Sequence, residues 1–104
     1  MLRMQQLLEF LKDDPADVFT LYALALENIK INEQHTAIEL LNKVITLNPE
    51  YVAAYYQLGQ LLEKTNANQA AIIYKQGIEV ATRTKNSHAR SELSTAYSNL
   101  LNDD

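Results

Sequence analysis

Apolar residues recur at helical spacing along the chain, and residues 18–31 give the first clear case. One face of this segment carries residues at positions i, i+3, i+4 and i+7: Leu21, Leu24, Ala25 and Asn28. A second stripe begins a few residues later: Ile38, Leu40, Leu41, Val44, Ile45 and Leu47. The pattern predicts two amphipathic helices joined by a turn at Asn32–Gln34.

The same pattern returns after 34 residues, which is the separation between Pro15 and Pro49. A shift of this size pairs equivalent positions: Leu21 with Tyr55, Tyr22 with Tyr56, Leu24 with Leu58, and Ala25 with Gly59. The matching stripes of the second copy are Tyr55, Leu58, Gly59 and Leu62, then Ala70, Ile73, Tyr74, Gly77 and Ile78. A fixed period of this size is typical of stacked helical repeats.

The proline and the glycine both have a physical reason within this repeat. Pro49 cannot continue a preceding helix and biases Asn48 away from helical backbone angles. Gly59 costs about 1 kcal/mol relative to alanine inside a helix, so a close approach between helices must offset it. We expect Ala25 and Gly59 to allow that approach, and the turn in the second copy to lie at Asn66–Asn68.

These spacings resemble the tetratricopeptide repeat (TPR) family. The first copy reads Leu21-x2-Leu24-Ala25-x2-Asn28, then Ala37-x3-Leu41, then Pro49; the second reads Tyr55-x2-Leu58-Gly59-x2-Leu62, then Ala70-x3-Tyr74. Asn28 departs from the pattern, because an aromatic residue is usual there. Thr82 stands in the place of the proline, so the preceding helix is expected to continue towards Lys85.

The resemblance implies an all-α fold, a right-handed superhelical TPR solenoid of antiparallel helix pairs with about six helices. We predict a single domain over residues 1–104. It would consist of an N-terminal half-repeat helix (1–17), a first repeat (18–51), a second repeat (52–84) and a C-terminal capping helix (87–102) that begins at Ser87. The capping helix would turn a stripe inward: Leu93, Ala96, Tyr97, Leu100 and Leu101. Small bacterial TPR proteins with two repeats and flanking helices look similar over the whole length.

Composition narrows the classes of function. The chain has no cysteine, which excludes disulfides, thiolate zinc sites and a cysteine nucleophile. A formal net charge of -4 argues against a nucleic-acid partner. No apolar run approaches the ~20 residues that span a bilayer, and the N-terminal segment lacks the uninterrupted apolar stretch of a signal peptide. We therefore expect a cytoplasmic protein with no membrane partner.

Candidate catalytic groups are sparse. His35 and His88 lie far apart in sequence without companion ligands, so both are interpreted as surface residues rather than bases or metal ligands. A basic cluster comprises Arg83, Lys85, His88 and Arg90. It would either bind a phosphate or an acidic tail or, as we favour, place Arg83 and Lys85 at a helix C-terminus. We predict no enzymatic activity, no cofactor and no metal.

The family presents the inner face of each first helix to a concave groove, and the sequence has a second stripe there. Its members are Phe19, Tyr22, Leu26 and Ile29, which a shift of 34 converts to Ala53, Tyr56, Gln60 and Glu63. The candidate ligand-binding residues are Phe19, Tyr22, Leu26, Lys30, Tyr56, Gln57, Gln60 and Lys64. Phe19 and Leu26 are either groove residues or covered by the N-terminal helix, whereas Tyr22 and Tyr56 are expected to be exposed.

Two functions remain open on this basis. The first is a non-catalytic scaffold that binds a protein or peptide in the groove. The clamp of lysine, arginine and asparagine that some TPR domains use for chaperone tails is missing from the stripe. The alternative is a homo-oligomerising structural module that associates through its apolar ends. Apolar residues of the N-terminal helix are spread too broadly for one stripe: Leu2, Leu7, Leu8, Phe10 and Leu11. A monomer or a weak homodimer is expected.

Overall fold

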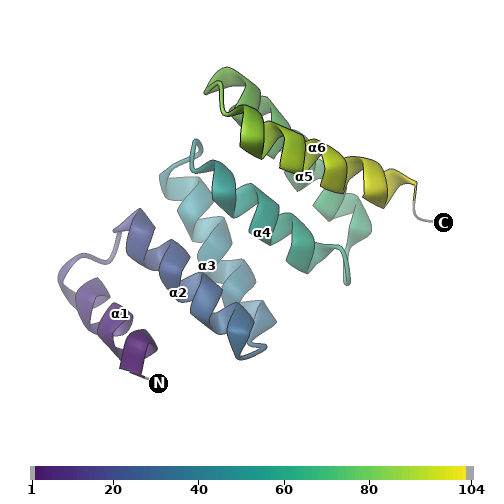
Figure 1. Ribbon diagram of the computed structural model, residues 1–104. Helices are drawn as coiled ribbons and strands as arrows, with labels where there is room; N and C mark the ends of the chain where they lie inside the picture. The colour runs from purple at the N-terminus through teal and green to yellow at the C-terminus, as the bar shows by residue number, and fades with distance from the viewer. Residues whose placement is uncertain (1, 103–104) are drawn as a thin grey trace. The chain divides into compact units, whose positions relative to one another are not determined.

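The structure is a computed structural model that describes residues 2–102, so Met1 of the predicted N-terminal segment lies outside the described residues. These residues form six α-helices and no strand (Figure 1). The chain divides into two compact units, one ending at Asn48 and the other beginning at Pro49. The first unit contains α1 (Leu2–Asp13), α2 (Val18–Lys30) and α3 (Gln34–Leu47), and the second contains α4 (Val52–Leu62), α5 (Ala67–Arg83) and α6 (Ser87–Leu101).

The core of the first unit lies between α2 and α3, which pack as an antiparallel pair (Figure 1). The two predicted stripes supply it: Leu21, Leu24 and Ala25 from α2, and Ala37, Leu41 and Val44 from α3 are all buried. Asp17 begins α2 as its N-cap, where its carboxylate accepts a hydrogen bond of 3.1 Å from the backbone N–H of Thr20. The helical pattern of the sequence thus accounts for this pair directly.

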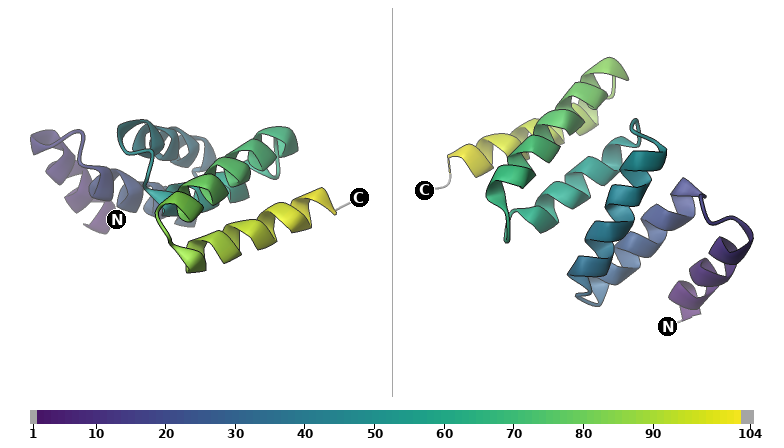
Figure 2. Two further views of the ribbon diagram at one scale, coloured as in Figure 1. Left: turned by 90° about the horizontal axis from the view of Figure 1, so that it is seen from above. Right: turned by 180° about the vertical axis from the view of Figure 1, so that it is seen from behind.

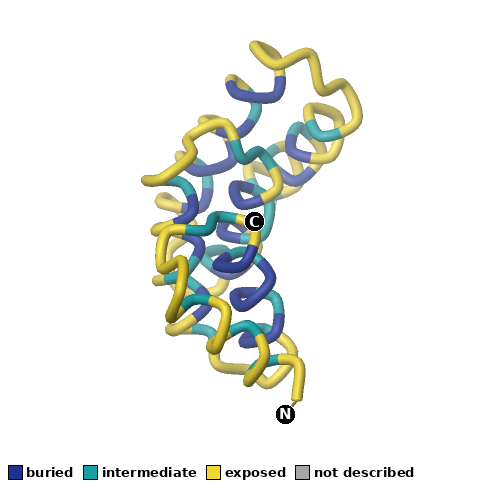
Figure 3. The backbone as a smooth tube through the Cα atoms, turned by 90° about the vertical axis from the view of Figure 1, so that its left-hand side faces the viewer, coloured by how far each residue is buried: buried dark blue, intermediate teal, exposed yellow. Residues whose placement is uncertain are grey.

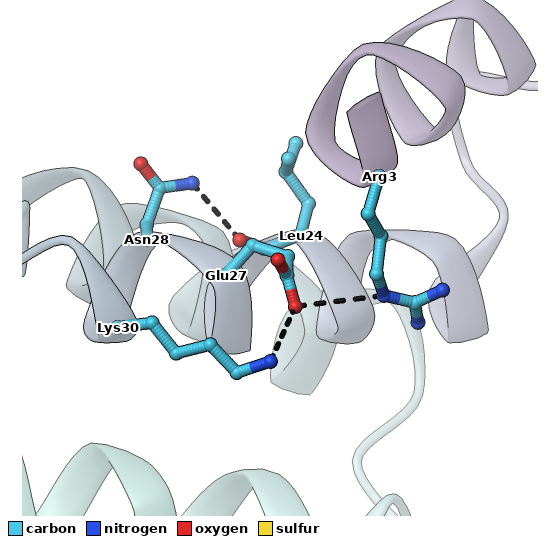
Figure 4. A network of polar contacts seen from close by, with 5 residues as sticks. All are labelled: Arg3, Leu24, Glu27, Asn28 and Lys30. Atoms are coloured by element: carbon cyan, nitrogen blue, oxygen red, sulfur yellow. Dashed lines mark hydrogen bonds and ion pairs between the residues drawn. The ribbon is translucent and has the colours of Figure 1, made fainter. Parts of the chain in front are cut away.

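Helix α1 packs on α2 in a different way, because none of its residues from Leu2 to Asp13 is buried. Figure 3 marks exposure along the backbone, and the larger apolar side chains of α1 that stay exposed are Leu2, Leu8 and Phe10. A polar contact also joins the two helices. The Glu27 carboxylate, only 7% exposed, lies 3.5 Å from Nε of Arg3 and 3.0 Å from Nζ of Lys30 (Figure 4).

In the second unit, α5 packs against both α4 and α6, and α4 also contacts α6 (Figure 2). Two glycines allow close packing. A Cβ atom at Gly59 would lie 2.2 Å from Cε1 of Tyr74, and one at Gly77 would lie 2.7 Å from Cβ of Tyr55. Gly59 therefore permits the close approach of α4 and α5 that the sequence predicted.

Two helices end in the same backbone motif. After α2 the N–H groups of Asn32 and Glu33 donate to the carbonyls of Ile29 and Asn28, and after α5 those of Lys85 and Asn86 donate to Thr82 and Ala81. Asn32 and Lys85 have φ angles of 62° and 60°, the left-handed conformation that this Schellman motif requires. Helix α5 ends at Arg83, close to the predicted extension.

Three local expectations need correction. The turn before α5 lies at Glu63–Asn66 rather than Asn66–Asn68, because Asn66 acts as the N-cap and accepts a hydrogen bond from the Gln69 N–H. Asn86, not Ser87, caps α6, since its side chain accepts from the Ala89 N–H. Leu101, expected to face inward, is 58% exposed in the last turn of α6.

Candidate functional site

A cleft of about 570 Å³ lies between α4 and α6 in the second unit. Helix α4 contributes Tyr56 and Gln60, and Glu63 follows just beyond its last turn, so these side chains lie at i, i+4 and i+7. The opposite wall comes from one face of α6: His88, Ser91, Glu92, Thr95, Ala96 and Asn99. Both walls therefore follow from helical spacing, and the packing of α4 and α6 on α5 brings them together.

A partly buried hydrogen-bond network fixes one wall of the cleft. Tyr74 is fully buried beneath it, and its hydroxyl donates to Oε2 of Glu63 and accepts a hydrogen bond of 2.8 Å from Nε2 of Gln60. Burial raises the pKa of the Tyr74 phenol, and the hydrogen bond and negative charge of Glu63 raise it further. The buried Tyr74 thus orients the side chains of two cleft residues, Gln60 and Glu63, through its hydroxyl.

The chemistry of the lining is polar and acidic. Glu63 and Glu92 bring carboxylates, Ser91, Thr95 and Asn99 bring neutral hydrogen-bonding groups, and Tyr56 brings an aromatic ring. None of the described residues that line the cleft is Lys or Arg. Such a surface offers hydrogen bonds, an apolar contact and a negative field to an incoming segment.

The candidate residues of the first unit all lie on α2. Phe19 is 68% exposed, so α1 does not cover it, while Tyr22 and Leu26 are half-buried. Lys30 is exposed and forms the ion pair with Glu27. These positions carry a partly open apolar face, and their role in binding stays a prediction.

The candidate residues of the second unit separate into two groups. Tyr56, half-buried, and Gln60, exposed, line the cleft, whereas Gln57 and Lys64 do not. The residues that α6 contributes were not predicted to line the groove, because α6 was interpreted as a capping helix. The available signal was the polar series His88, Ser91, Thr95 and Asn99, which recurs at steps of three or four.

The predicted basic cluster does not form one site. Arg83 lies in the last turn of α5 with its Nε 3.6 Å from a Glu50 carboxylate oxygen, and His88 lines the α4–α6 cleft. Lys85 and Arg90 line a separate, smaller hollow of about 190 Å³. Within residues 2–102 no group of three or more His, Cys, Asp or Glu side chains is placed to hold a metal ion, and no helix is long and apolar enough to cross a membrane.

Comparison with solved structures identifies the family of this chain. The chain is similar to a tetratricopeptide repeat domain protein from Salinibacter ruber, whose crystal structure is 36% identical over 85% of this chain and 99% of that chain, with a TM-score of 0.80. The chain belongs to the tetratricopeptide repeat family. A solution NMR structure of a tetratricopeptide repeat domain protein from Salinibacter ruber agrees, with 37% identity over 88% of this TPR chain and 93% of that chain and a TM-score of 0.82.

Further comparisons are consistent with this assignment. A model of the TPR repeat matches residues 29–66. The crystal structure of MamA shares the fold at 24% identity, with a TM-score of 0.69 over 94% of this chain and 64% of that chain. No curated protein matches. The predicted TPR family and the predicted all-α helical-repeat fold are confirmed, and TPR folds act in general as non-catalytic scaffolds for protein interaction.

Proposed function

We propose that this TPR protein is a non-catalytic module that binds a protein or peptide segment, and that the α4–α6 cleft is one of its binding surfaces. The observation that carries the proposal is the cleft itself, in which Tyr56 and Gln60 face a polar stripe of α6. Hollow surfaces with an apolar contact and a few fixed polar groups are the usual form of a recognition site. The half-open face of α2, with Phe19, Tyr22 and Leu26, is a candidate for a second contact.

Tyrosine suits this role because it gives a large contact area and a polar tip with few rotatable bonds. The cleft tyrosine has a neighbour with the opposite environment. Tyr55 is 4% exposed and its hydroxyl donates a hydrogen bond of 2.6 Å to the Pro49 carbonyl, whereas Tyr56 is half-buried on the cleft wall. Tyr55 is therefore a structural tyrosine, and Tyr56, one position further along, is the proposed binding tyrosine.

A selection experiment tests the proposal. The full chain is panned against an unbiased library of displayed nonapeptides, in parallel with Tyr56→Ala and with Tyr97→Ala, which removes a half-buried tyrosine outside the cleft. Wild type and Tyr97→Ala are expected to retain common peptides that Tyr56→Ala loses. If Tyr56→Ala retains the same peptides, the cleft is not the binding surface.

A second candidate function is self-association through the first unit. It is favoured by the exposed apolar side chains of α1 and by Phe19, which α1 leaves uncovered. Light scattering over a concentration series tests it with wild type and Phe10→Ser, since Phe10 is 55% exposed. A monomer mass at every concentration would remove this function, and a dimer lost on Phe10→Ser would support it.

A further inference from the structure

We propose that the α4–α6 cleft selects partner segments that carry a lysine or arginine side chain. This inference rests on the proposed function, because it names the chemistry of the segment that the cleft receives. Two carboxylates line the cleft, those of Glu63 and Glu92, and no lining residue among those described is Lys or Arg. A cationic side chain is the charge complement of this lining, and an acidic tail is repelled by it.

The Glu63 carboxylate is positioned to accept a further hydrogen bond. The hydrogen bonds from Tyr74 and Gln60 both reach its Oε2 atom, and its Oε1 atom accepts none from the described residues. Since the Tyr74 hydroxyl is anchored in the core, the carboxylate is oriented before a partner arrives, which lowers the entropy cost of binding. The free oxygen is the acceptor that a lysine ammonium or an arginine guanidinium needs.

Glu92 supplies the second charge from the facing helix. Its side chain is exposed, lines the cleft and makes no ion pair with any residue from 2 to 102. Tyr56 adds an aromatic face at the same cleft, which attracts a cation through the negative charge above the ring. Ser91, Thr95 and Asn99 offer hydrogen bonds to the backbone of the same segment.

The experiment extends the library selection with Glu92→Gln, Glu63→Gln and Glu79→Gln. The glutamine at position 63 keeps an acceptor for the Tyr74 hydroxyl, and Glu79 is an exposed carboxylate of α5 outside the cleft. We expect the peptides that depend on Tyr56 to be enriched in Lys or Arg at one position. This enrichment should persist with Glu79→Gln and weaken with the two cleft variants.

A peptide from the selection then gives the affinity. Replacing its conserved Lys or Arg by norleucine removes the charge while keeping an apolar stem, and we expect a loss of about tenfold with wild type but about threefold or less with the Glu63→Gln/Glu92→Gln double variant. Affinity should also fall as salt is raised from about 0.05 to 0.5 M.

The outcomes separate the two claims. Tyr56-dependent peptides without basic enrichment, or with acidic enrichment, would overturn this inference and leave the proposed function standing. Failure to recover any Tyr56-dependent peptide would overturn both.

Discussion

The backbone of Gly59 on α4 lies against the ring of Tyr74 on α5, so closely that a Cβ atom at position 59 would be 2.2, 2.6 and 2.7 Å from three ring carbons. Tyr74 has no exposed surface, so its ring is surrounded by other core atoms. Its hydroxyl in turn holds Glu63 and Gln60 at the cleft. One small residue of the repeat motif thus sets the position of a buried ring, and the ring sets the position of a candidate binding group.

Gly59→Ala is expected to destabilise the protein by about 1–3 kcal/mol, because overpacking of a filled core exceeds the roughly 1 kcal/mol that alanine gains in helix propensity. Urea denaturation followed by circular dichroism measures the change. In a Tyr74→Leu background the clash is absent, so adding Gly59→Ala should there be neutral or stabilising. Equal losses in both backgrounds would show that the ring contact is not the cause.

Lys85→Gly is expected to stabilise the protein by about 0.5 kcal/mol. Lys85 has a φ of 60°, which costs a residue with a Cβ roughly 1–2 kcal/mol, while the greater freedom of glycine in the unfolded chain offsets part of the gain. Lys75→Gly is the matched control, since Lys75 is exposed in the interior of α5 and should lose about 1 kcal/mol. Two losses of similar size in urea denaturation would contradict the prediction.

Glu27→Ala is expected to loosen α1 from α2. Helix α1 buries no side chain, and the carboxylate of Glu27 contacts both Arg3 and Lys30 (Figure 4). Because the two cations are largely exposed, the contact is worth about 1 kcal/mol, which corresponds to about fivefold faster hydrogen exchange of the α1 amides. Glu9→Ala removes an exposed ion pair within α1 and should leave α1 docked. If Glu9→Ala accelerated the hydrogen exchange of the α1 amides equally, the effect of Glu27→Ala would come from the change in charge and not from the contact with Arg3 and Lys30.

Alkaline pH is expected to destabilise the second unit. Burial raises the pKa of both Tyr74 and Tyr55. Glu63 raises the pKa of Tyr74 further, whereas the positive charge of Arg83 partly lowers that of Tyr55. The folded state therefore favours the neutral phenols, so their contribution is complete below the unfolded pKa of about 10 and is lost as the pH rises above it. Urea midpoints from pH 8 to 11 measure this, and Tyr74→Phe should flatten the decline. A decline of unchanged slope would show that Tyr74 is not its source.

The helices follow from the sequence because burial and helical period coincide at residues such as Leu24, Leu41 and Leu58. Their ends are less certain. Asn86 and Ser87 are both good caps, and only the hydrogen bond from the Ala89 N–H selects Asn86. Asn28 fits at a position where an aromatic residue is usual, because its side-chain amide donates a hydrogen bond of 2.9 Å to the Leu24 carbonyl of its own helix.

The candidate site was predictable only in part. Tyr56 and Gln60 stand out because the repeat shift places them on the stripe equivalent to Tyr22 and Leu26. The facing wall depends on how α6 packs beside α4, and no local pattern encodes that packing. The exposure of Phe19 could not be predicted for the same reason, since it depends on where α1 docks on α2.

The shared ending of α2 and α5 has a consequence for how such chains change. Residues 31–33 and residues 84–86 turn the backbone through the same pair of hydrogen bonds, the first between α2 and α3 and the second between α5 and α6. Because the two connections share one backbone geometry, we expect either three-residue segment to replace the other without changing the path of the backbone.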